Sequence, residues 1–416
     1  MNKKKLNGLG ILLIGLIILC TFFIYQNSKI NNTTSQDYKV MPNGLGISVH
    51  PLVTEQDIKS IADAGFKWVR IDIFWDKVET KKGSYDFKKT GYDELNKWLK
   101  EYEIKPYYTL SFSNKLYEKD RSIVTQPGRE GFANFVTAAT SRYKNQSGIW
   151  EIWNEPNIDK FWNPQPNIRD YMSLVKKISP IIREQDPTAV IVAPAIAGTR
   201  PESLKWLEKA LKSDLLNYID LLSVHPYRDS NPETVVQDYK KIKNLIKTSS
   251  DKNISVISGE WGYSTQGVSE RVQAEYLTRM VLTNSQQSIP ISILYNWKND
   301  GTDLGNKEHN FGITWRDSNL KLSYVAVQTL TKQLKGYRYT KILKYGLEGD
   351  YILEFKNENE NKILAFWTTS SNHKLTIPLE QGKGKLISML GAFRNVEWKG
   401  ELEINLSSSP NYLVIE

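Results

Sequence analysis

Two glutamates stand in short motifs suited to acid–base and nucleophilic chemistry. Glu155 lies in Trp-Asn-Glu-Pro-Asn at 153–157, and Glu260 lies in Gly-Glu-Trp-Gly at 259–262. Each glutamate ends a run of strand character, and Pro156 biases Glu155 toward an extended backbone. Two converging carboxylates can cleave a glycosidic bond, because one protonates the leaving oxygen while the other attacks the anomeric carbon. A separation of about 5 Å would favour retention of configuration through a covalent sugar–enzyme ester.

A single glutamate at the end of a strand is more often a plain surface residue, so the surrounding elements decide the interpretation. Short runs rich in β-branched and aromatic residues recur eight times, at 44–50, 68–74, 105–112, 149–154, 189–195, 219–225, 254–259 and 291–297. Segments with helical periodicity alternate with them, at 55–64, 91–102, 131–143, 168–185, 202–211, 232–247, 270–283 and 323–335. This alternation between residues 42 and 336 predicts a (β/α)8 barrel, whose catalytic residues lie at the C-terminal ends of the strands.

After Gly336 the pattern of hydrophobic residues changes to a period of two. Runs of this kind, separated by turn residues, lie at 351–355, 362–367, 374–378, 385–389 and 402–406. They predict a small antiparallel β-sandwich at 337–416. Its aromatic residues Trp367, Phe393 and Trp398 could bind sugar or brace the barrel, and bracing is the preferred interpretation.

The N-terminal residues predict a membrane anchor. A basic tail at 1–7 precedes an uncharged, largely apolar run at 8–25, which is about the minimum length for a helix that spans the bilayer. Lysines before the run and none immediately after it place the N-terminus inside and the remaining chain outside. Residues 26–41 read as a polar linker. The alternative is a cleaved signal peptide and a secreted protein, and both interpretations predict export.

Composition excludes several classes of protein and site. The chain has 416 residues, of which 40% are hydrophobic, so an ordinary globular protein is expected. Part of the net charge of +9 comes from lysines in the N-terminal segment, and the rest is too diffuse for a nucleic-acid interface. A single cysteine, Cys20, and four histidines argue against a Cys/His metal cluster, and the loop at 300–303 lacks calcium-loop spacing. We therefore expect no metal, no organic cofactor, no nucleic acid, and a monomer.

The two glutamate motifs, separated by three predicted strands, resemble those of retaining glycoside hydrolases with catalytic glutamates on barrel strands four and seven. Within that clan the sequence is most similar to family 39 and to bacterial endoglycosidases that cut biofilm exopolysaccharide. The resemblance covers the predicted barrel. It includes the segments 70–75, 78–79, 83–87, 113–117 and 225–227, and 408–412 in the predicted sandwich.

The resemblance implies Glu155 as the acid/base and Glu260 as the nucleophile. Once Glu260 is esterified, its repulsion of a charged Glu155 vanishes, so Glu155 can change from an acid to a base toward water. Asn154 holds the clan position that hydrogen-bonds the sugar 2-hydroxyl, although a strand-end asparagine can also satisfy a turn. Tyr227 holds the clan position for a hydroxyl on the nucleophile.

Charged and imidazole side chains near the predicted strand ends have two interpretations each. Arg70 supports the nucleophile by the resemblance, and its alternative is a structural ion pair with Asp72 or another acid inside the barrel. His225 lies two residues before Tyr227, and alone it would be a hydrogen-bonded core histidine. His50 ends the first strand and could contact sugar hydroxyls or cap the strand.

Aromatic residues could form the substrate platform, although core packing is the alternative for each. Trp297 ends the eighth predicted strand, where the clan places an aromatic residue beneath the sugar at the cleavage point. Further substrate contacts are predicted for Trp75, Trp153, Trp261, Asn114, Tyr117 and Trp162.

These observations predict a membrane-anchored, outward-facing retaining endoglycosidase that acts on an exopolysaccharide or a wall-associated glycan. An exo-acting β-xylosidase-like enzyme and a transglycosylase are alternatives, because they differ only in subsite shape and water access. A non-catalytic glycan-binding or scaffold protein on the same fold is a third alternative, since fold does not imply activity.

Overall fold

The computed structural model describes residues 37–416. The predicted basic tail at 1–7 and membrane anchor at 8–25 lie outside these residues, as does most of the predicted linker. Within 37–416, no helix is both long and apolar enough to cross a bilayer. The described end of the linker packs on the barrel: the ring of Tyr38 lies 5.7 Å from that of Trp68, and the backbone of Met41 pairs with Gly336 and Tyr337.

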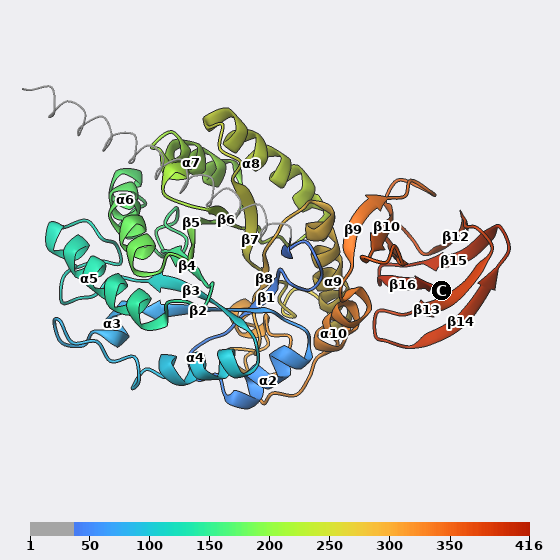
Figure 1. The fold of residues 1–416 in the computed structure, drawn as a ribbon, viewed down its shortest axis with the longest axis horizontal. Helices are drawn as coiled ribbons and strands as arrows, with labels where there is room; N and C mark the ends of the chain where they lie inside the picture. Colours follow the sequence, from blue (N-terminus) through green and yellow to red (C-terminus); the bar gives the residue numbers. More distant parts are fainter. Residues whose placement is uncertain (1–36) are drawn as a thin grey trace, which may run out of the picture.

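Eight parallel strands form a closed barrel in sequence order (Figure 1). They are β1 (Leu45–Ser48), β2 (Trp68–Phe74), β3 (Lys105–Ser111), β4 (Ile149–Ile152), β5 (Val190–Ala197), β6 (Leu221–His225), β7 (Ser255–Trp261) and β8 (Ser292–Leu294). The predicted barrel is therefore confirmed. The main difference is the end of β8, which stops three residues before the predicted end at Trp297.

Helices connect the strands and surround the barrel. They are α2 (Glu55–Asp63), α3 (Trp75–Val78), α4 (Tyr92–Glu101), α5 (Gln126–Tyr143), α6 (Ile168–Gln185), α7 (Pro201–Leu211), α8 (Val235–Ser249), α9 (Glu270–Gln286) and α10 (Leu322–Leu334), with 3-10 turns η1 (Leu215–Asn217), η2 (Pro232–Thr234) and η3 (Lys307–Asn310). Local capping sets their starts. Thr125 caps α5 by accepting a hydrogen bond from the Gly128 amide, so this helix begins five residues before the predicted 131.

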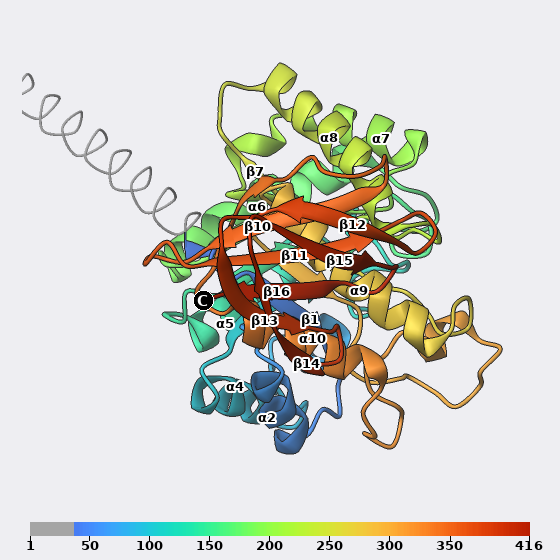
Figure 2. The ribbon, with the colours of Figure 1, turned by 90° about the vertical axis from the view of Figure 1, so that its right-hand side faces the viewer.

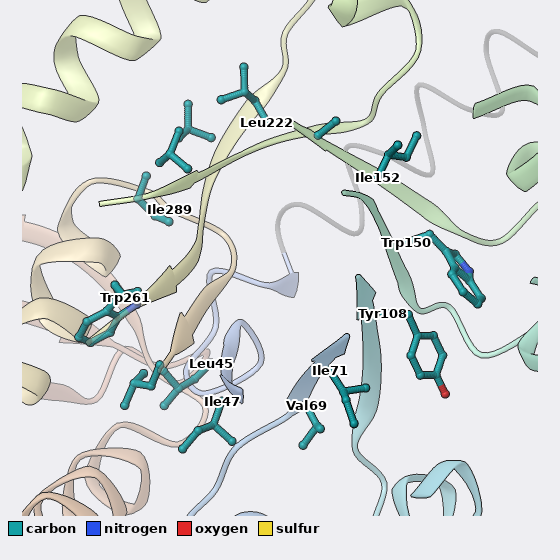
Figure 3. Close-up of a cluster of buried hydrophobic side chains, with 14 of the residues drawn as sticks. Leu45, Ile47, Val69, Ile71, Tyr108, Trp150, Ile152, Leu222, Trp261 and Ile289 are labelled. Atoms are coloured by element: carbon teal, nitrogen blue, oxygen red, sulfur yellow. The ribbon is translucent and has the colours of Figure 1, made fainter. Parts of the chain in front are cut away.

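Alternation along the strands separates two hydrophobic layers. On β2, Val69 and Ile71 belong to the core between strands and helices, whereas Trp68 belongs to an inner cluster with Tyr107 and Ile149. Figure 3 shows the outer layer, in which Tyr108 of β3 and Trp150 of β4 lie side by side, 4.9 Å between ring centroids. Arg70 lies two residues after Trp68 on β2, and residues two apart on a strand share a face, so the Arg70 side chain also points into the barrel.

The remaining strands build two antiparallel sheets beside the barrel (Figures 1 and 2). They are β9 (Arg338–Ile342), β10 (Asp350–Lys356), β11 (Lys362–Thr368), β12 (His373–Pro378), β13 (Gly382–Ile387), β14 (Phe393–Trp398), β15 (Glu401–Leu406) and β16 (Asn411–Ile415). Six strands pair in the order β14-β13-β16-β11-β10-β9, and β12 pairs with β15 in a second sheet. The C-terminal antiparallel β-structure is therefore as predicted, with two sheets of unequal size.

The two faces of the larger sheet pack on different neighbours. Leu353 and Ala365 belong to the core shared with the barrel, whereas their neighbours Ile352 and Leu364 belong to the core shared with β12 and β15. In Figure 1, α9 and α10 lie between the barrel strands and this sheet. Successive side chains of β10 and β11 point to opposite faces of the larger sheet, so one face packs on the barrel and the other on the smaller sheet.

A buried ion pair joins the barrel to the larger sheet. Arg279 of α9 donates two hydrogen bonds of 2.7 Å to Glu233 in η2, and the indole N–H of Trp367 on β11 donates a third, also of 2.7 Å, to the same carboxylate. Tyr351 stacks on Trp367 with 4.9 Å between ring centroids. Glu233 lies on the segment after β6, six residues beyond Tyr227, so the sheet contacts the same loop that carries this tyrosine.

Candidate active site

A cavity of about 450 Å³ opens at the C-terminal ends of the barrel strands. Its walls are formed by residues from most of the barrel: Ser48, Val49, His50, Arg70, Asp72, Phe74, Phe112, Asn154, Glu155, Lys160, Phe161, Tyr227, Glu260, Tyr295, Lys307, Glu308 and Phe311. Both motif glutamates are therefore in one hollow. Catalytic residues of this fold gather at that end of the barrel.

Glu260 is held at both carboxylate oxygens. Arg70 donates to Oε2 at 2.6 Å, and the Tyr227 hydroxyl donates to Oε1 at 2.7 Å. The preceding residue must be glycine, because a Cβ on Gly259 would lie 2.0 Å from the Ser223 hydroxyl oxygen. This close approach of β7 to β6 fixes where the Glu260 side chain starts.

The pKa of Glu260 is below its ordinary value. Burial alone raises the pKa of this carboxyl, but the charge of Arg70, then that of His225, and the Tyr227 hydrogen bond together outweigh burial. Glu260 is therefore ionised at neutral pH, as a nucleophile must be.

Arg70 has a second carboxylate partner, Glu151 on β4, which the sequence analysis did not single out. Nε and Nη2 of Arg70 donate to Oε2 of this fully buried residue at 3.1 and 2.9 Å. The Tyr107 and Thr109 hydroxyls donate to the same carboxylate. Arg70 therefore has both predicted roles at once, support of Glu260 and a structural ion pair inside the barrel.

Asp72, the first partner considered for Arg70, instead accepts a hydrogen bond of 2.8 Å from the Ser111 hydroxyl. Burial raises the pKa of Asp72, against the opposing effect of Arg70. Its side chain borders the cavity, and none of the Arg70 hydrogen bonds ends on it. Asp72 thus presents an acceptor to whatever occupies the cavity.

The chain turns sharply after β4 to bring Glu155 into the cavity. Trp153 has φ 70° and Glu155 has φ 48°, in the left-handed region rather than the extended one expected before Pro156. Tertiary hydrogen bonds impose this strained backbone: the Glu155 amide donates to Ala195 O at 3.0 Å, and the Trp153 indole donates to Phe161 O at 3.0 Å.

The Glu155 carboxylate faces Glu260 across a short gap. One carboxylate oxygen of Glu155, one of Glu260 and one ring nitrogen of His225 lie within 4.8 Å of one another. Nδ1 of His225 lies 2.8 Å from Glu155 Oε1, while its Nε2 has no hydrogen-bond partner among residues 37–416. Burial lowers the pKa of His225, but the nearby Glu260 and Glu155 raise it above the ordinary value overall.

The same three side chains are the residues among 37–416 that could converge on a metal ion. Their chemistry does not suit a cation, because both Glu260 oxygens already accept hydrogen bonds and the Arg70 guanidinium lies 2.6 Å from one of them. The donor set matches an acid–base pair with its supporting residues better than a metal centre.

Two more of the predicted residues, Asn154 and His50, lie at the cavity. Asn154 Oδ1 accepts from Arg70 Nη2 at 2.7 Å, which leaves the amide nitrogen of Asn154 to donate elsewhere. His50 Nε2 lies 3.1 Å from the Tyr295 hydroxyl and 3.4 Å from Asp300 Oδ2. His50 therefore belongs to a polar cluster on the cavity wall.

Trp297 does not border this cavity but lines the adjoining hollow of about 210 Å³. This residue is 3% exposed, and its indole N–H donates to Asp57 Oδ1 at 2.9 Å. Because β8 ends at Leu294, the aromatic side chain that reaches the cavity is Tyr295. Tyr295 thus borders the cavity at the end of β8, where the sequence analysis expected Trp297.

The other predicted substrate contacts pack in the core behind the site. Trp75 lies between the rings of Tyr117 and Phe135, and both Trp75 and the Tyr117 hydroxyl donate to the buried Glu79. Asn114 donates to the Glu79 carbonyl. The remaining members, Trp153, Trp162 and Trp261, are also buried and do not border the cavity. The tryptophans use their apolar surface for packing, which was the alternative interpretation for them, whereas Tyr117 is half-buried.

A pair of phenylalanines forms a wall that the sequence analysis missed. Phe112 and Phe161 stack with 5.4 Å between ring centroids and 9° between planes, and Arg121 lies 4.9 Å above Phe112. They come from the segments after β3 and after β4, which are distant in sequence. Phe112 ends the predicted strand at 105–112 and Phe161 lies in an irregular segment after β4, so their pairing depends on the fold and has no signal in the sequence.

A parallel barrel with two carboxylates across a cavity at the strand ends is typical of glycoside hydrolases. Residues 31–301 match the family model described as Cellulase (glycosyl hydrolase family 5). The chain belongs to this family.

Solved structures agree with the clan recognised from the motifs. A family 39 glycoside hydrolase from Bacteroides cellulosilyticus has a TM-score of 0.80 and 25% identity, covering 91% of this chain and 82% of that chain. A family 39 enzyme from Xanthomonas axonopodis has a TM-score of 0.66 and 16% identity over 90% and 94% of the two chains. A β-xylosidase from Caulobacter crescentus has a TM-score of 0.66 and 15% identity over 90% and 96%. At their lower identities, the second and third similarities concern the fold.

Proposed function

We propose that this glycoside hydrolase cleaves an extracellular polysaccharide by double displacement with retention of configuration. The observation that carries the proposal is the distance of at most 4.8 Å between carboxylate oxygens of Glu155 and Glu260. Inverting enzymes need about 6.5–9.5 Å between the carboxyl groups to admit a water molecule, whereas retaining enzymes need about 5–5.5 Å. The short gap supports direct attack by one carboxylate.

In the first step Glu260 forms a bond to the anomeric carbon while Glu155 gives its proton to the departing glycosidic oxygen. In the second step Glu155 takes a proton from water, whose oxygen attacks the same carbon and releases Glu260. Arg70 and Tyr227 favour the charged Glu260, and His225 positions Glu155. Asn154 is oriented by Arg70 to hydrogen-bond the sugar hydroxyl next to the reacting carbon.

Action within a chain is supported by a second hollow that continues from the catalytic cavity. It measures about 210 Å³ and shares Ser48, Val49 and His50 with the cavity. A groove that extends past the two glutamates would accept sugars beyond the cleaved bond, as endo-acting enzymes require. The competing exo-acting function is favoured by one observation, the similarity to a structure described as a β-xylosidase.

We also propose that the enzyme works at the outer surface of the cytoplasmic membrane. The support is the sequence of residues 1–25, in which lysines precede an apolar run. Membrane attachment there would place the enzyme where polysaccharide leaves the cell, which fits trimming during export of an exopolysaccharide or wall-associated glycan.

The experiment compares Glu260→Gln and Glu155→Gln with the full chain in mild detergent, on 4-nitrophenyl glycosides and on a panel of bacterial exopolysaccharides. Glu260→Gln should abolish turnover of every substrate. Glu155→Gln should lose about 10²- to 10⁴-fold on polysaccharide and less on nitrophenyl glycosides, whose leaving group needs little protonation. The surface variant Glu94→Gln is the matched control.

Product analysis separates the alternatives. Retained anomeric configuration by NMR and a rapid fall in polymer length support a retaining endo-acting enzyme. Release of single xylose units from chain ends would support the exo-acting function. Inverted products, or full activity of Glu260→Gln, would contradict the proposed mechanism.

A further inference from the structure

The turn between β1 and α2 holds a leucine in an unfavourable setting (Figure 1). Leu52 has φ 82°, in the left-handed region where a residue with a Cβ is strained. Its side chain is 91% exposed, the highest value for a large hydrophobic residue among residues 37–416. Pro51 before it suits the first central position of a type II turn, whose second central position favours glycine or asparagine. Folding alone therefore does not account for leucine at this position.

Hydrogen bonds fix the chain on both sides of this turn. His50 Nε2 lies 3.1 Å from the Tyr295 hydroxyl. Further along the chain, the Thr54 amide donates to Asp57 Oδ2 at 3.0 Å, and the Thr54 hydroxyl accepts from the Asp57 amide at 3.2 Å. The chain must turn between these two fixed points, which imposes the backbone conformation at position 52 but not the choice of side chain.

Leu52 borders the hollow that continues from the catalytic cavity. Two other residues of the lining are held in place, because the Trp297 indole N–H and Lys298 Nζ both donate to Asp57 at 2.9 Å. Leu52 belongs to none of the buried hydrophobic clusters within 37–416. Its isobutyl group therefore leaves apolar surface uncovered beside a hollow whose other residues are fixed.

An exposed leucine alone is an ordinary surface feature. Leu52 differs because exposure, backbone strain and a place next to the catalytic cavity coincide at one residue. We propose that Leu52 contacts the substrate at a subsite remote from the cleaved bond. Its isobutyl group covers the C–H face of a sugar ring in a chain that leaves the catalytic cavity through the hollow. The inference rests on the polymeric substrate proposed above.

The chemistry of the side chain defines what it can recognise. An isobutyl group offers no hydrogen bond, so it favours binding only by covering apolar surface. A sugar ring presents such surface on its C–H face, while the hydroxyls at its edge stay in water. A nitrophenyl glycoside of a single sugar fills only the positions next to Glu155 and Glu260. Leu52 therefore favours long chains over short substrates.

The experiment uses the full chain in mild detergent and three substitutions at one position. Leu52→Ala removes the isobutyl group and keeps the strained Cβ, Leu52→Gly removes both, and Leu52→Met keeps an apolar side chain. Leu347→Ala is the control, because Leu347 is also exposed, at 65%, and borders neither the cavity nor the hollow. The substrates are the exopolysaccharide of the panel above and the nitrophenyl glycoside that the wild-type chain cleaves fastest.

Leu52→Ala and Leu52→Gly should raise KM for the polymer about five- to tenfold, because covering most of a leucine side chain favours binding. Leu52→Met and Leu347→Ala should stay within about twofold of the wild type, as should kcat/KM of every variant on the nitrophenyl glycoside. Leu52→Gly should melt no lower than the wild type, since glycine adopts a positive φ without strain. A residue needed only for folding would instead lose stability in Leu52→Ala and Leu52→Gly alike.

The inference and the proposed function fail in different ways. Polymer cleavage that is insensitive to Leu52→Ala, or an equal loss on the nitrophenyl glycoside, overturns the contact and leaves the proposed function intact. If the wild-type chain cleaves no polymer, the proposed function fails, and affinity electrophoresis in gels that contain xylan or the exopolysaccharides then decides. Retardation of the wild type that Leu52→Ala weakens supports the contact, whereas equal retardation, or none, overturns it.

Discussion

Nη1 of Arg70 lies 2.6 Å from Oε2 of Glu260, while Nη2 and Nε of the same guanidinium bind Glu151. One buried cation therefore serves two carboxylates, of which only one faces the cavity. The arrangement links the chemistry of Glu260 to the stability of the barrel interior.

Tyr227→Phe should shift the acidic limb of the activity profile to higher pH. The Tyr227 hydroxyl is one of the groups that lower the pKa of Glu260, so removing this hydroxyl raises that pKa and a higher pH is needed to ionise the nucleophile. Because a hydrogen bond to a charged group contributes about 1.5–3 kcal/mol, kcat/KM should fall about 10- to 100-fold. The measurement is kcat/KM against pH on a nitrophenyl glycoside.

Tyr263→Phe is the matched control for that profile. Tyr263 is also buried, but its hydroxyl donates to Ser230 O at 3.0 Å and does not border the cavity. An equal shift in both variants would mean that Tyr227 does not act through Glu260.

Arg70→Met should destabilise the fold by about 3–5 kcal/mol, because it leaves the Glu151 charge buried without its partner. Adding Glu151→Gln should recover part of this loss, since the amide carries no charge. Denaturant unfolding of both variants, followed by fluorescence, measures the difference. Arg142→Met breaks a surface pair with Asp93 and should cost about 1 kcal/mol or less. The idea would be falsified if the double variant were less stable than Arg70→Met alone.

Gly259→Ala should reduce kcat at least about tenfold by displacing Glu260, because the new Cβ would overlap the Ser223 hydroxyl. With Ser223→Ala added, the nearest atoms to that Cβ are the Tyr107 hydroxyl at 3.2 Å and the Ser223 Cβ at 3.3 Å, so much of the activity should return. Steady-state kinetics and melting temperatures of the single and double variants test this. Failure of the second substitution to restore kcat would place the damage elsewhere.

Trp367→Phe should lower stability by about 1.5–3 kcal/mol, because it removes a hydrogen bond to the buried Glu233 carboxylate while keeping an aromatic ring. Trp398→Phe removes a bond to a neutral carbonyl and should cost about 0.5–1.5 kcal/mol. Equal losses in the two variants would show that the Glu233 contact adds nothing to the joint between barrel and sheet.

The periodic parts of the fold could be predicted from sequence, and the missed parts have little periodic signal. β2 was predicted with its observed ends because five of its seven residues are β-branched or aromatic strand formers. β9 was missed because most of its residues are exposed and polar, which removes the hydrophobic alternation. β14 is likewise an exposed edge strand whose alternation is weak.

The candidate site shows the same division between local pattern and tertiary contact. Asn154, Glu155 and Glu260 lie in short sequence motifs, so they could be identified as candidate site residues from the sequence. Glu151 lies inside a strand that reads as ordinary core, and its role exists only through Arg70 on another strand. In a strand that ran to 297, Tyr295 and Trp297 would share one face, but β8 ends at Leu294, so this alternation does not hold beyond it and only Tyr295 borders the cavity.

The position of β16 in the larger sheet has a consequence for synthesis. Although β16 comes after all the other strands in the chain, it pairs between β13 and β11 in the middle of the sheet. During translation, the edges of β13 and β11 that pair with β16 therefore stay unpaired until Asn411–Ile415 leaves the ribosome. A ribosome that stalls before this segment would therefore release a chain with two unpaired strand edges, which are prone to pair with other chains.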